Sequence, residues 1–559
     1  MIAKTLRTSR LLYFVIGTLA VSVLALIQTY LSRWPGRGRL YYPIFDRLFT
    51  YTDNRGAAVE ILVVLLACAV PAIRRAGARL AVAMGANPGW TAGATFVVVA
   101  LGARFAYHAT PFSMDESVQV SQAYAFAGGS LSWIVPPDLL DRMIPIGFRN
   151  YFYIVNQTTG QTASAYWPGF AALLTPFVWA DVPWLLNPAL TAASLLLIHA
   201  ICVRLLGDKD AGGWAMLFAL GSVQFTINGM SYYSMPAHLA LNLLYAWLLL
   251  DGRPSHALLA GLVGGFALVL HNPVPHVLFA IPWLIWLLRD PRRWGALVAA
   301  AVGYIPIGLV VGFVWPLYLG SFGPTPAAAT AHSDVGTLWL MIYTKLTSVI
   351  ALPDFPMVCA RLYATWKIWI WSVPGLLLLA IQGARVVRGP ILLFGASAAV
   401  TYAFYWLVPL DQGHGWGYRY FHSAWAALPL LGAAFIVTQP LANEDGFAWR
   451  QWAGGFAVAS LVLSTTLQAW QVDATIGEHV GQRISVPDRG RWILFVTPQR
   501  GLYTWDMIQN FPGDRQKLTL MSFGAASDAA LVASRYPQAQ RMILDRRGSL
   551  WSLPSGQQP

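Results

Sequence analysis

Reactive side chains are concentrated in one short connector, DQGHGWGYRYFH, which occupies residues 411–422 between two apolar runs. Arg419 lies there, and Asp411, His414, Tyr418 and His422 are gathered around it. An arginine beside a membrane is costly unless it snorkels or meets an anion, and its planar guanidinium suits phosphate oxygens. The connector therefore indicates phosphate or pyrophosphate contact, with a purely structural loop as the alternative.

Two adjacent acids occur in a second polar segment, PFSMDESVQVSQAYAFAGGSL, where Asp115 and Glu116 open a helical pattern. Acids in a first helical turn are commonly partners of the helix dipole or of its cap, and that is the structural alternative here. Neighbouring helical positions point about 100° apart, so the two carboxylates cannot flank one glycosidic bond as a hydrolase pair does. One carboxylate at a time can face a cleft.

The segment TASAYWPGFAALLTPF places Tyr166 and Trp167 directly before Pro168 and an apolar run. Such aromatics are typical of the membrane interface. If a helix begins here at the outer face, its first N–H groups are free for an anion, and a lipid phosphate is the obvious anion at that depth. The segment thus predicts a re-entrant or interfacial helix with an anion at its N-terminus.

Histidines mark two further connectors, NGMSYYSMPAH (228–238) and HNPVPH (271–276). His238, His271 and His276 are a candidate metal site, but the close helical spacing of His-x-x-x-His is absent. A lone histidine near an interface is more often a hydrogen-bonded packing residue. A divalent cation is therefore the one cofactor that stays open, and no metal ligands are assigned.

These segments need a membrane framework, because the 559 residues are 57% hydrophobic and only 11% charged, with a mean hydropathy of +0.53. Soluble proteins carry about 25% charged residues, so the chain is a polytopic membrane protein. The net charge of +13 comes from short basic clusters between apolar runs. That is the positive-inside pattern and not a nucleic-acid groove.

Thirteen membrane spans are predicted, with ends that shift by several residues: 11–31, 57–72, 92–108, 185–204, 213–229, 237–250, 255–270, 277–288, 295–316, 368–383, 390–409, 423–438 and 452–470. No Asp, Glu, Lys or Arg is expected in the middle of any of them. Basic clusters near residues 4–10, 74–79, 289–293 and 385–388 place the N-terminus in the cytoplasm. The loop 109–184 and the long loop 317–367 then begin and end outside, and all the polar connectors share that outer face.

The last part of the chain, from about residue 471, loses the long apolar runs. Short strands are predicted at 492–496, 517–522 and 541–545, with helical patterns near 502–510 and 525–535. The expected fold is therefore an all-α polytopic membrane protein of about 13 transmembrane helices with a small C-terminal α/β extramembrane domain. Three parts are predicted: N-terminal helices (1–91), a transmembrane catalytic domain (92–470) and a periplasmic domain (471–559).

The early Asp-Glu pair, the following SQAYAFAGG and the later YWPGFAALLTPF resemble segments of the GT-C superfamily of integral-membrane glycosyltransferases. That superfamily includes protein O-mannosyltransferases and lipid A aminoarabinose transferases. This chain departs from some members in having Ala165 and Tyr166 where they carry a lysine, and a single proline, Pro168. The resemblance implies a GT-C-like fold and makes Asp115 the catalytic acid, with Glu116 as its neighbour.

The resemblance further implies sugar transfer from a polyprenyl-phosphate donor to an envelope glycan, lipid or protein acceptor, outside the bacterial cytoplasmic membrane. Asp115 is then the base, and direct displacement inverts the anomeric centre. The predicted donor-phosphate and substrate-binding residues are Arg419, His414, His422, Tyr418, Tyr166, Tyr233, His238 and His271. Membrane lipids are the other expected partners, and nucleic acid is not one.

Three other classes compete with this reading. A secondary transporter usually has ionisable residues near the midplane and two repeated halves, and the sequence shows no repeat. A lipid-linked glycan ligase or polymerase uses similar donors but lacks the early Asp-Glu pair. A non-catalytic membrane scaffold is the remaining alternative. Release of free polyprenyl phosphate from a polyprenyl-phosphate sugar separates a transferase from a transporter.

Overall fold

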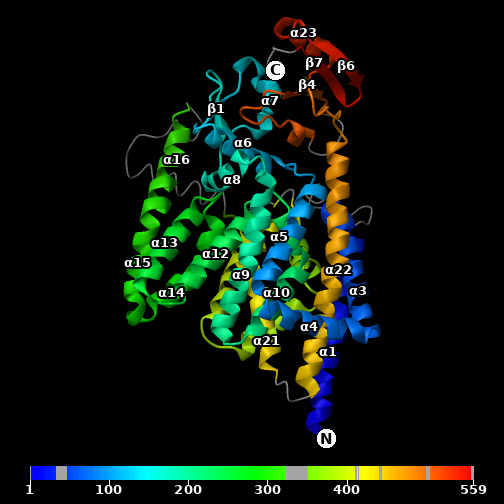
Figure 1. The fold of residues 1–559 in the computed structure, drawn as a ribbon, viewed down its shortest axis with the longest axis vertical. Helices are drawn as coiled ribbons and strands as arrows, with labels where there is room; N and C mark the ends of the chain where they lie inside the picture. Colours follow the sequence, from blue (N-terminus) through cyan, green and yellow to red (C-terminus); the bar gives the residue numbers. More distant parts are fainter. Residues whose placement is uncertain are drawn as a thin grey trace.

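The computed structural model describes residues 2–32, 47–322, 350–408, 412, 415–439, 444–498 and 504–554. It is a bundle of helices with a small sheet at one end and the N-terminal end of α1 at the other (Figure 1). The predicted fold class, an all-α polytopic membrane protein with a small C-terminal α/β domain, is confirmed.

The helices of the bundle follow the apolar runs of the sequence. They are α1 (Ile2–Leu31), α3 (Asn54–Ala69), α4 (Pro71–Ala86), α5 (Pro88–Phe105), α9 (Leu186–Leu206), α10 (Lys209–Gly221), α11 (Val223–Gly229), α12 (Met235–Leu249), α13 (Pro254–Leu268), α14 (Val274–Leu288), α15 (Trp294–Tyr304), α16 (Val310–Gly320), α18 (Phe355–Ile370), α19 (Leu376–Val386), α20 (Ile391–Tyr405), α21 (Ala427–Thr438) and α22 (Glu444–Val480). A π-helical turn, η6 (Ile305–Leu309), joins α15 to α16.

Four helical stretches in the described part of the chain are long and apolar enough to cross a membrane, namely Arg10–Leu31, Pro183–Leu206, Pro291–Gly320 and Ala448–Val480. A fifth is added if Leu48–Ala69 and Pro71–Ala86, bent by 99°, form one broken span. Shorter apolar helices of 10–17 residues make up most of the rest. The protein is multi-pass, and the total of thirteen spans stays a prediction.

Small residues let the helices approach closely, as is common in membrane bundles. Gly261 of α13 faces α15, where an added Cβ would lie 2.1 Å from the Ala300 carbonyl oxygen. Gly303 of α15 is equally close to the Leu258 carbonyl, at 2.3 Å. A larger side chain at either position would push the two helices apart.

The predicted span 368–383 is wrong. Helix α18 ends at Ile370 and α19 begins at Leu376, so this segment contains a turn and not a continuous helix. Pro374 disfavours helical backbone at the residue before it, and Gly375 adopts a left-handed conformation with φ of +79°. Helix α18 instead occupies part of the predicted long outer loop 317–367, whose residues 323–349 lie outside the described part of the chain.

The expectation of no charged residue within a span is also wrong. A π-helical turn, η1 (Leu48–Asp53), precedes α3 and starts the helical stretch earlier than the sequence indicated, so Glu60 lies well inside it. Glu60 is fully buried and accepts a hydrogen bond from Ser22 Oγ at 3.4 Å. At the end of η1, Asp53 forms an ion pair with Lys367 of α18, and both side chains are buried.

The outer loop between α5 and α9 carries its own small structure, which the sequence did not indicate beyond two helical patterns. Helices α6 (Met114–Ala127), α7 (Leu140–Met143) and α8 (Gly169–Trp179) accompany a three-stranded antiparallel sheet. Its strands are β1 (Trp133–Ile134), β2 (Tyr153–Val155) and β3 (Gln161–Ser164), in the order β1-β3-β2. This layer lies over the end of the bundle farthest from the N-terminal end of α1 (Figure 1).

Helix α8 is the predicted re-entrant or interfacial segment, and its length agrees with that reading. At 11 residues it is about 16 Å long, against about 30 Å for a bilayer core. It begins at Gly169, directly after Pro168, and packs against α6. It therefore does not cross the membrane alone.

The C-terminal domain forms a four-stranded sheet in the order β5-β4-β7-β6. Strands β4 (Arg491–Val496), β5 (Lys517–Met521) and β6 (Gln540–Asp545) match the predicted strands, and α23 (Ala525–Arg535) matches a predicted helix. Strand β7 (Gly548–Leu553) was missed. Only β4 and β5 are parallel, and α22 continues to Val480, beyond the predicted boundary at 471.

Candidate active site

Helix α6 begins with a capping box that points its two acids in different directions. Ser113 is the N-cap residue, and the Glu116 side chain accepts hydrogen bonds from the backbone N–H groups of Phe112 and Ser113 at 2.7 and 3.1 Å. Glu116 is thus turned back into the protein, and Asp115 is left facing outward from the start of the helix. The sequence-based argument that only one carboxylate faces a cleft is consistent with this geometry.

Asp115 forms an ion pair with Arg419, which follows it by some 300 residues. Both terminal nitrogens of the guanidinium donate to Asp115 Oδ2 at 3.0 Å. The other carboxylate oxygen, Oδ1, accepts a hydrogen bond from the Tyr166 hydroxyl. The Asp115 side chain keeps 21% of its surface exposed, whereas Arg419 keeps 7%. The structure thus brings the two predicted halves of the site into direct contact.

The charge state of Asp115 follows from these partners. Burial raises the pKa of this carboxyl, but the Arg419 guanidinium and the Tyr166 hydroxyl outweigh burial and hold the pKa below its usual value. The same ion pair raises the pKa of Arg419. In this structure the acid is therefore ionised at neutral pH and held by its partner.

Arg419 is itself positioned from three sides. Its backbone N–H donates to Gln412 Oε1 at 2.9 Å, and its Nη2 donates to the Gln412 carbonyl oxygen. The guanidinium lies 4.4 Å from the centre of the Tyr233 ring, a cation–π contact. Nε has no hydrogen-bond partner among the described residues, so one donor of the guanidinium is uncommitted there.

Glycine is required at one position of the connector for this arrangement. Gly415 has φ of +134°, and a Cβ at this position would lie 2.8 Å from Arg419 Cδ. A side chain there would strain the backbone and displace the arginine. The spacing of the glycines in DQGHGWGYRYFH thus contributes to the position of Arg419.

His271 lies directly beside Tyr166. The two rings lie 4.0 Å apart between centroids, and Gln119 Nε2 lies 3.3 Å from His271 Nδ1. Burial lowers the pKa of His271 to about 4, with Asp115 opposing that shift and Arg419 adding to it. His271 is therefore neutral near pH 7 and has hydrogen-bonding capacity without a charge.

Glu116, predicted as a second catalytic residue, is fully buried and saturated with donors. Besides the two capping bonds it accepts hydrogen bonds from the Tyr107 hydroxyl and from the Tyr232 N–H, both at 2.8 Å. Burial raises its pKa to about 7, and these hydrogen bonds oppose the shift. The geometry fits a residue that fixes the start of α6 and not one that faces a substrate.

The expected anion site at the N-terminus of α8 is wrong. The N–H groups of Gly169 and Phe170 donate to the carbonyl oxygens of Val269 and Leu270 at 2.8 and 2.7 Å, and Trp167 N–H donates to the His271 carbonyl at 3.3 Å. Helix N-termini bind anions only through N–H groups that are otherwise unpaired. Here the neighbouring connector takes those groups, and Tyr166 contributes its side chain instead.

Of the other predicted residues, only Tyr233 among those that the structure describes contacts Arg419 through its side chain. Tyr233 lies under Arg419 and shares a hydrogen bond with Ser113 at 3.0 Å. His238 is fully buried in α12, and neither ring nitrogen has a partner among the described residues. Tyr418 N–H donates to Gln224 Oε1 at 2.9 Å, and His422 Nδ1 lies 3.2 Å from Gln224 Nε2. These last two hold the connector against α11. His414 and Asp411 lie outside the described residues.

Three contributors were missed by the sequence reading, namely Ser113, Gln119 and Gln412. Gln119 follows Asp115 by four positions, so helical spacing places the two on one face, and that signal was present. Ser113 is a typical N-cap residue. Gln412 was inside the quoted connector, but its role depends on the fold of the loop, which the sequence does not reveal.

The structure does not bring the described residues together into a set of ligands for the divalent cation considered above. Within the described residues, no group of three or more His, Cys, Asp or Glu side chains is arranged to hold a metal ion. His276 Nδ1 lies 2.8 Å from Asn242 Oδ1, and its Nε2 lies 2.7 Å from the Tyr304 hydroxyl. Both oxygens of Asp115 are already paired. The described side chains therefore offer no ligand set for a divalent cation, and no catalytic step is assigned to one.

Comparison with known proteins gives fold-level similarity alone. No protein-family model matches the sequence, and no curated protein matches it. The structure is similar to ArnT from Cupriavidus metallidurans in the apo state, with a TM-score of 0.49 and 12% identity over 84% of this chain and 98% of that chain. The same protein bound to undecaprenyl phosphate gives 0.49 and 13% over the same shares. Function is therefore argued from the side chains described above.

Proposed function

We propose that this protein transfers a sugar from a polyprenyl-phosphate donor to a hydroxyl of an envelope glycan, lipid or protein acceptor. The observation that carries the proposal is the ion pair between Asp115 and Arg419, in which the acid keeps an exposed face. A lipid phosphate is already a reasonable leaving group. The reaction therefore needs a base for the acceptor and a cation for the phosphate, and this pair provides one of each.

The reaction exchanges one carbon–oxygen bond for another. The acceptor oxygen forms a bond to the anomeric carbon of the sugar, and the bond from that carbon to the phosphate oxygen breaks. Asp115 takes the proton of the acceptor hydroxyl, and polyprenyl phosphate leaves. Because the attack is a direct displacement, the anomeric configuration is inverted.

In the resting site Arg419 lowers the pKa of Asp115 and makes it a weak base. A donor phosphate competes for the guanidinium, whose planar fork suits phosphate oxygens. When Arg419 turns to the phosphate, Asp115 loses its strongest partner and its pKa rises. The base thus gains strength when the donor is bound, which couples deprotonation of the acceptor to the presence of the donor.

Neighbouring residues hold this geometry in the proposal. The Tyr166 hydroxyl orients the Asp115 carboxylate, and the ring of Tyr233 packs against the Arg419 guanidinium. His271, which is neutral near pH 7, provides a hydrogen-bonding group for the phosphate or sugar. Glu116 acts as a positioning residue that fixes the first turn of α6, because its carboxylate accepts the N–H groups there.

The proposal also includes the side of the membrane that the site faces. The site lies in the layer formed by α6 and α8, at the end of the bundle opposite the N-terminal end of α1 (Figure 1). The basic clusters predict a cytoplasmic N-terminus, which places the site and the C-terminal domain on the outer, periplasmic face of a bacterial inner membrane. A carrier lipid in the outer leaflet then presents its phosphate at the depth of the site.

The test uses the purified full-length protein in lipid nanodiscs with a polyprenyl-phosphate sugar labelled in the sugar. We expect release of free polyprenyl phosphate that increases when a cell-envelope fraction is added as acceptor, with the label moving to that fraction. Asp115→Asn should abolish both in a normally folded protein. Movement of the intact donor across a vesicle membrane without cleavage would overturn the proposal.

A coupled transporter is the second candidate, because the bundle contains buried ionisable groups. Asp53 and Lys367 form a sealed pair, and Glu60 is buried in α3. Intramembrane carboxylates of this kind are typical of proton or ion pathways. The vesicle assay distinguishes the two functions, since a transporter moves its substrate without breaking the bond to phosphate.

A further inference from the structure

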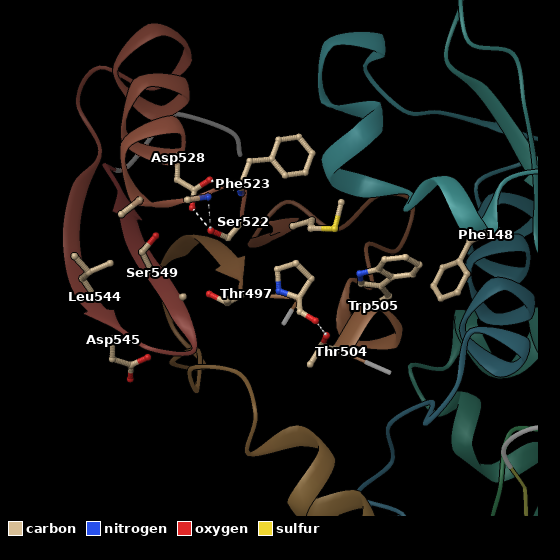
Figure 2. Close-up of a pocket in the computed structure, with 15 residues that line it drawn as sticks. Phe148, Thr497, Thr504, Trp505, Ser522, Phe523, Asp528, Leu544, Asp545 and Ser549 are labelled. Atoms are coloured by element: carbon tan, nitrogen blue, oxygen red, sulfur yellow. Dashed lines mark hydrogen bonds between the residues drawn. The ribbon is translucent and has the colours of Figure 1, made fainter. Parts of the chain in front are cut away.

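A cavity of about 1060 Å³ lies on the C-terminal domain, away from the Asp115 site. Figure 2 shows it between the sheet of this domain and the outer loop, with Trp505 and Phe148 on one side and Ser549 and Leu544 on the other. Its volume is slightly above the roughly 300–1,000 Å³ typical of small-molecule sites. Its walls thus come from two parts of the chain that are far apart in sequence.

The topology explains why a cavity forms at this edge. Strands β4 and β5 are parallel, and the cavity is lined by Thr497 and Ser522, the residues that follow them. Ligands in open α/β sheets bind beyond the carboxyl ends of such strands. Phe148 of the outer loop closes the far wall, where its ring meets Trp505 edge-on at 5.9 Å between centroids.

The lining combines aromatic rings with neutral hydroxyls. Trp505 and Phe523 keep 39% and 52% of their surface exposed, and in Figure 2 the indole nitrogen of Trp505 points toward the cavity. Hydroxyl groups come from Thr497, Ser522 and Ser549. Ser522 Oγ already donates to Asp528 Oδ2, and Ser549 Oγ already accepts a hydrogen bond from Trp551 Nε1 at 2.9 Å, so each keeps only part of its hydrogen-bonding capacity for a ligand. An exposed aromatic face suits the C–H face of a sugar ring, and the surrounding hydroxyls suit its oxygens.

The charges of the lining disfavour an anionic ligand. The described residues that line the cavity include Asp528 and Asp545 but no lysine or arginine. Both acids are already paired, Asp528 with Arg142 at 2.6 Å and Asp545 with Arg547 at 2.8 Å. Arg142 and Arg547 are thereby committed to these carboxylates, and among the described lining residues no further lysine or arginine is present to hold a phosphate or carboxylate group. A neutral, hydroxyl-rich ligand fits this lining best.

We propose that this cavity binds a short neutral oligosaccharide, with Trp505 as the stacking surface. The use of that site as an acceptor subsite rests on the proposed transferase function, but the binding itself does not. The cavity and Asp115 are joined through consecutive residues. Trp505 lines the cavity, and Asp506 Oδ1 accepts a hydrogen bond from the Met114 N–H at 3.1 Å, next to Asp115.

A second contact strengthens that connection. Gln509 Nε2 donates to the Pro111 carbonyl oxygen at 2.9 Å, so the segment 504–509 holds the backbone on both sides of the α6 N-cap. A saccharide stacked on Trp505 therefore contacts the segment 504–509, which holds the start of α6 and with it the proposed base, Asp115. This arrangement lets a bound acceptor chain fix the geometry of the catalytic carboxylate.

The test measures saccharide binding by the full-length protein in detergent, with saturation-transfer NMR and calorimetry. The probes are maltotriose, mannotriose and galactotriose, with glucose 6-phosphate and the peptide Gly-Ser-Gly as comparison ligands. We expect at least one neutral trisaccharide to bind, with the comparison ligands at least tenfold weaker. Binding of none of the three, or stronger binding of the phosphate or the peptide, would overturn the proposal.

Matched variants localise the binding. Trp505→Ala should weaken it at least tenfold, Trp505→Phe should keep it within about threefold because the ring remains, and Trp470→Ala, which removes an exposed tryptophan on α22, should leave it unchanged. A melting temperature for each variant identifies loss of folding, and if Trp505→Ala does not fold, Trp505→Leu, which fills the space without an aromatic face, carries the test and should weaken binding at least tenfold. Unchanged binding by a folded Trp505→Ala would overturn the site.

The two proposals fail separately. If saccharide binds at Trp505 but no sugar transfer occurs with any acceptor, the transferase function is wrong and the binding site stands. If transfer occurs and no neutral saccharide binds, the cavity proposal is wrong and the function stands. Asp115→Asn should lose transfer and keep binding.

Discussion

Two buried ion pairs join distant parts of this chain, and they differ in their access to solvent. Asp115 and Arg419 keep 21% and 7% of their side chains exposed, whereas Asp53 and Lys367 keep 0% and 1%. Asp53 also accepts a hydrogen bond from Trp371 Nε1 at 2.6 Å. The chemistry is the same, a carboxylate beside a cation. Of the two, only the first pair is open to solvent, as the proposed exchange of Arg419 from Asp115 to a donor phosphate requires.

The largest expected effect is on activity, from Asp115→Asn. Asparagine keeps the shape and still accepts a hydrogen bond from Arg419, but it cannot take a proton. Sugar transfer should therefore fall by about 10²- to 10⁴-fold, measured as release of polyprenyl phosphate. The melting temperature in detergent serves as the folding control. Full activity in this variant would refute Asp115 as the base.

The matched change in the sealed pair, Asp53→Asn, should act on stability instead. It leaves Lys367 buried beside a neutral group, and removing one partner of a buried pair costs about 3–5 kcal/mol. We expect a clearly lower melting temperature with the turnover rate per folded molecule unchanged. Normal stability with lost transfer would show that the sealed pair belongs to the reaction, and loss of substrate movement would favour a transporter.

Arg419→Lys tests whether use of the donor depends on the paired N–H groups of the guanidinium or on its positive charge alone. Lysine keeps the charge but cannot present two donors in one plane. The loss of one charge-assisted hydrogen bond, about 1.5–3 kcal/mol, corresponds to roughly a 10- to 150-fold weaker use of the donor, seen mainly as a higher KM. Arg204→Lys, in a pair with Asp251 whose side chains are 29% and 25% exposed, is the control and should leave the use of the donor unchanged.

Tyr166→Phe should have a smaller effect, because it removes one hydrogen bond and no charge. The Tyr166 hydroxyl helps to lower the pKa of Asp115, so its removal raises that pKa. Transfer should fall by about tenfold or less, and the loss of activity on acidification should begin at a higher pH. Tyr318→Phe, which removes a hydrogen bond to Ser132 in the outer loop, should leave the pH profile in place.

The smallest effect concerns stability and pH at Glu116. Burial raises its pKa to about 7 in the folded protein, from 4.5 for an ordinary glutamate. The folded state therefore binds more protons than the unfolded state between these values. The resulting stabilisation is fully present below about pH 4.5 and is lost as the pH rises through about 7. Glu116→Gln should flatten this part of the melting-temperature profile, and an unchanged profile would assign the dependence to another group.

Much of the architecture was predictable because it depends on local patterns. Apolar runs predicted most of the helices, and alternation predicted β4, β5 and β6 of the C-terminal domain. The errors have physical causes. The span at 368–383 failed because Pro374 and Gly375 turn the chain, and Glu60 was misjudged because a π-helical turn extends α3 at its start. Strand β7 was missed because its pattern is weak without its partners β4 and β6.

The contacts among the predicted site residues were foreseeable only in part, and their roles in a reaction stay a prediction. Asp115, Arg419 and Tyr166 were named from their residue types and positions, and the structure places them in one cluster. Glu116 belongs to a cap, and Tyr418 and His422 hold the connector against Gln224. The N-terminus of α8 has its N–H groups taken by the connector before α14. In each case the deciding factor was a contact between segments that are remote in sequence.

The sequence by itself determined that this is a membrane protein with its polar chemistry in a few connectors, because hydropathy and residue type are local properties. Only the tertiary structure decided which acid faces which cation. It left Asp115 open and sealed Asp53, and it set Asp506 of the C-terminal domain against the start of α6. Access to solvent and the pairing of charges depend on packing between distant segments, and no local pattern in the chain encodes them.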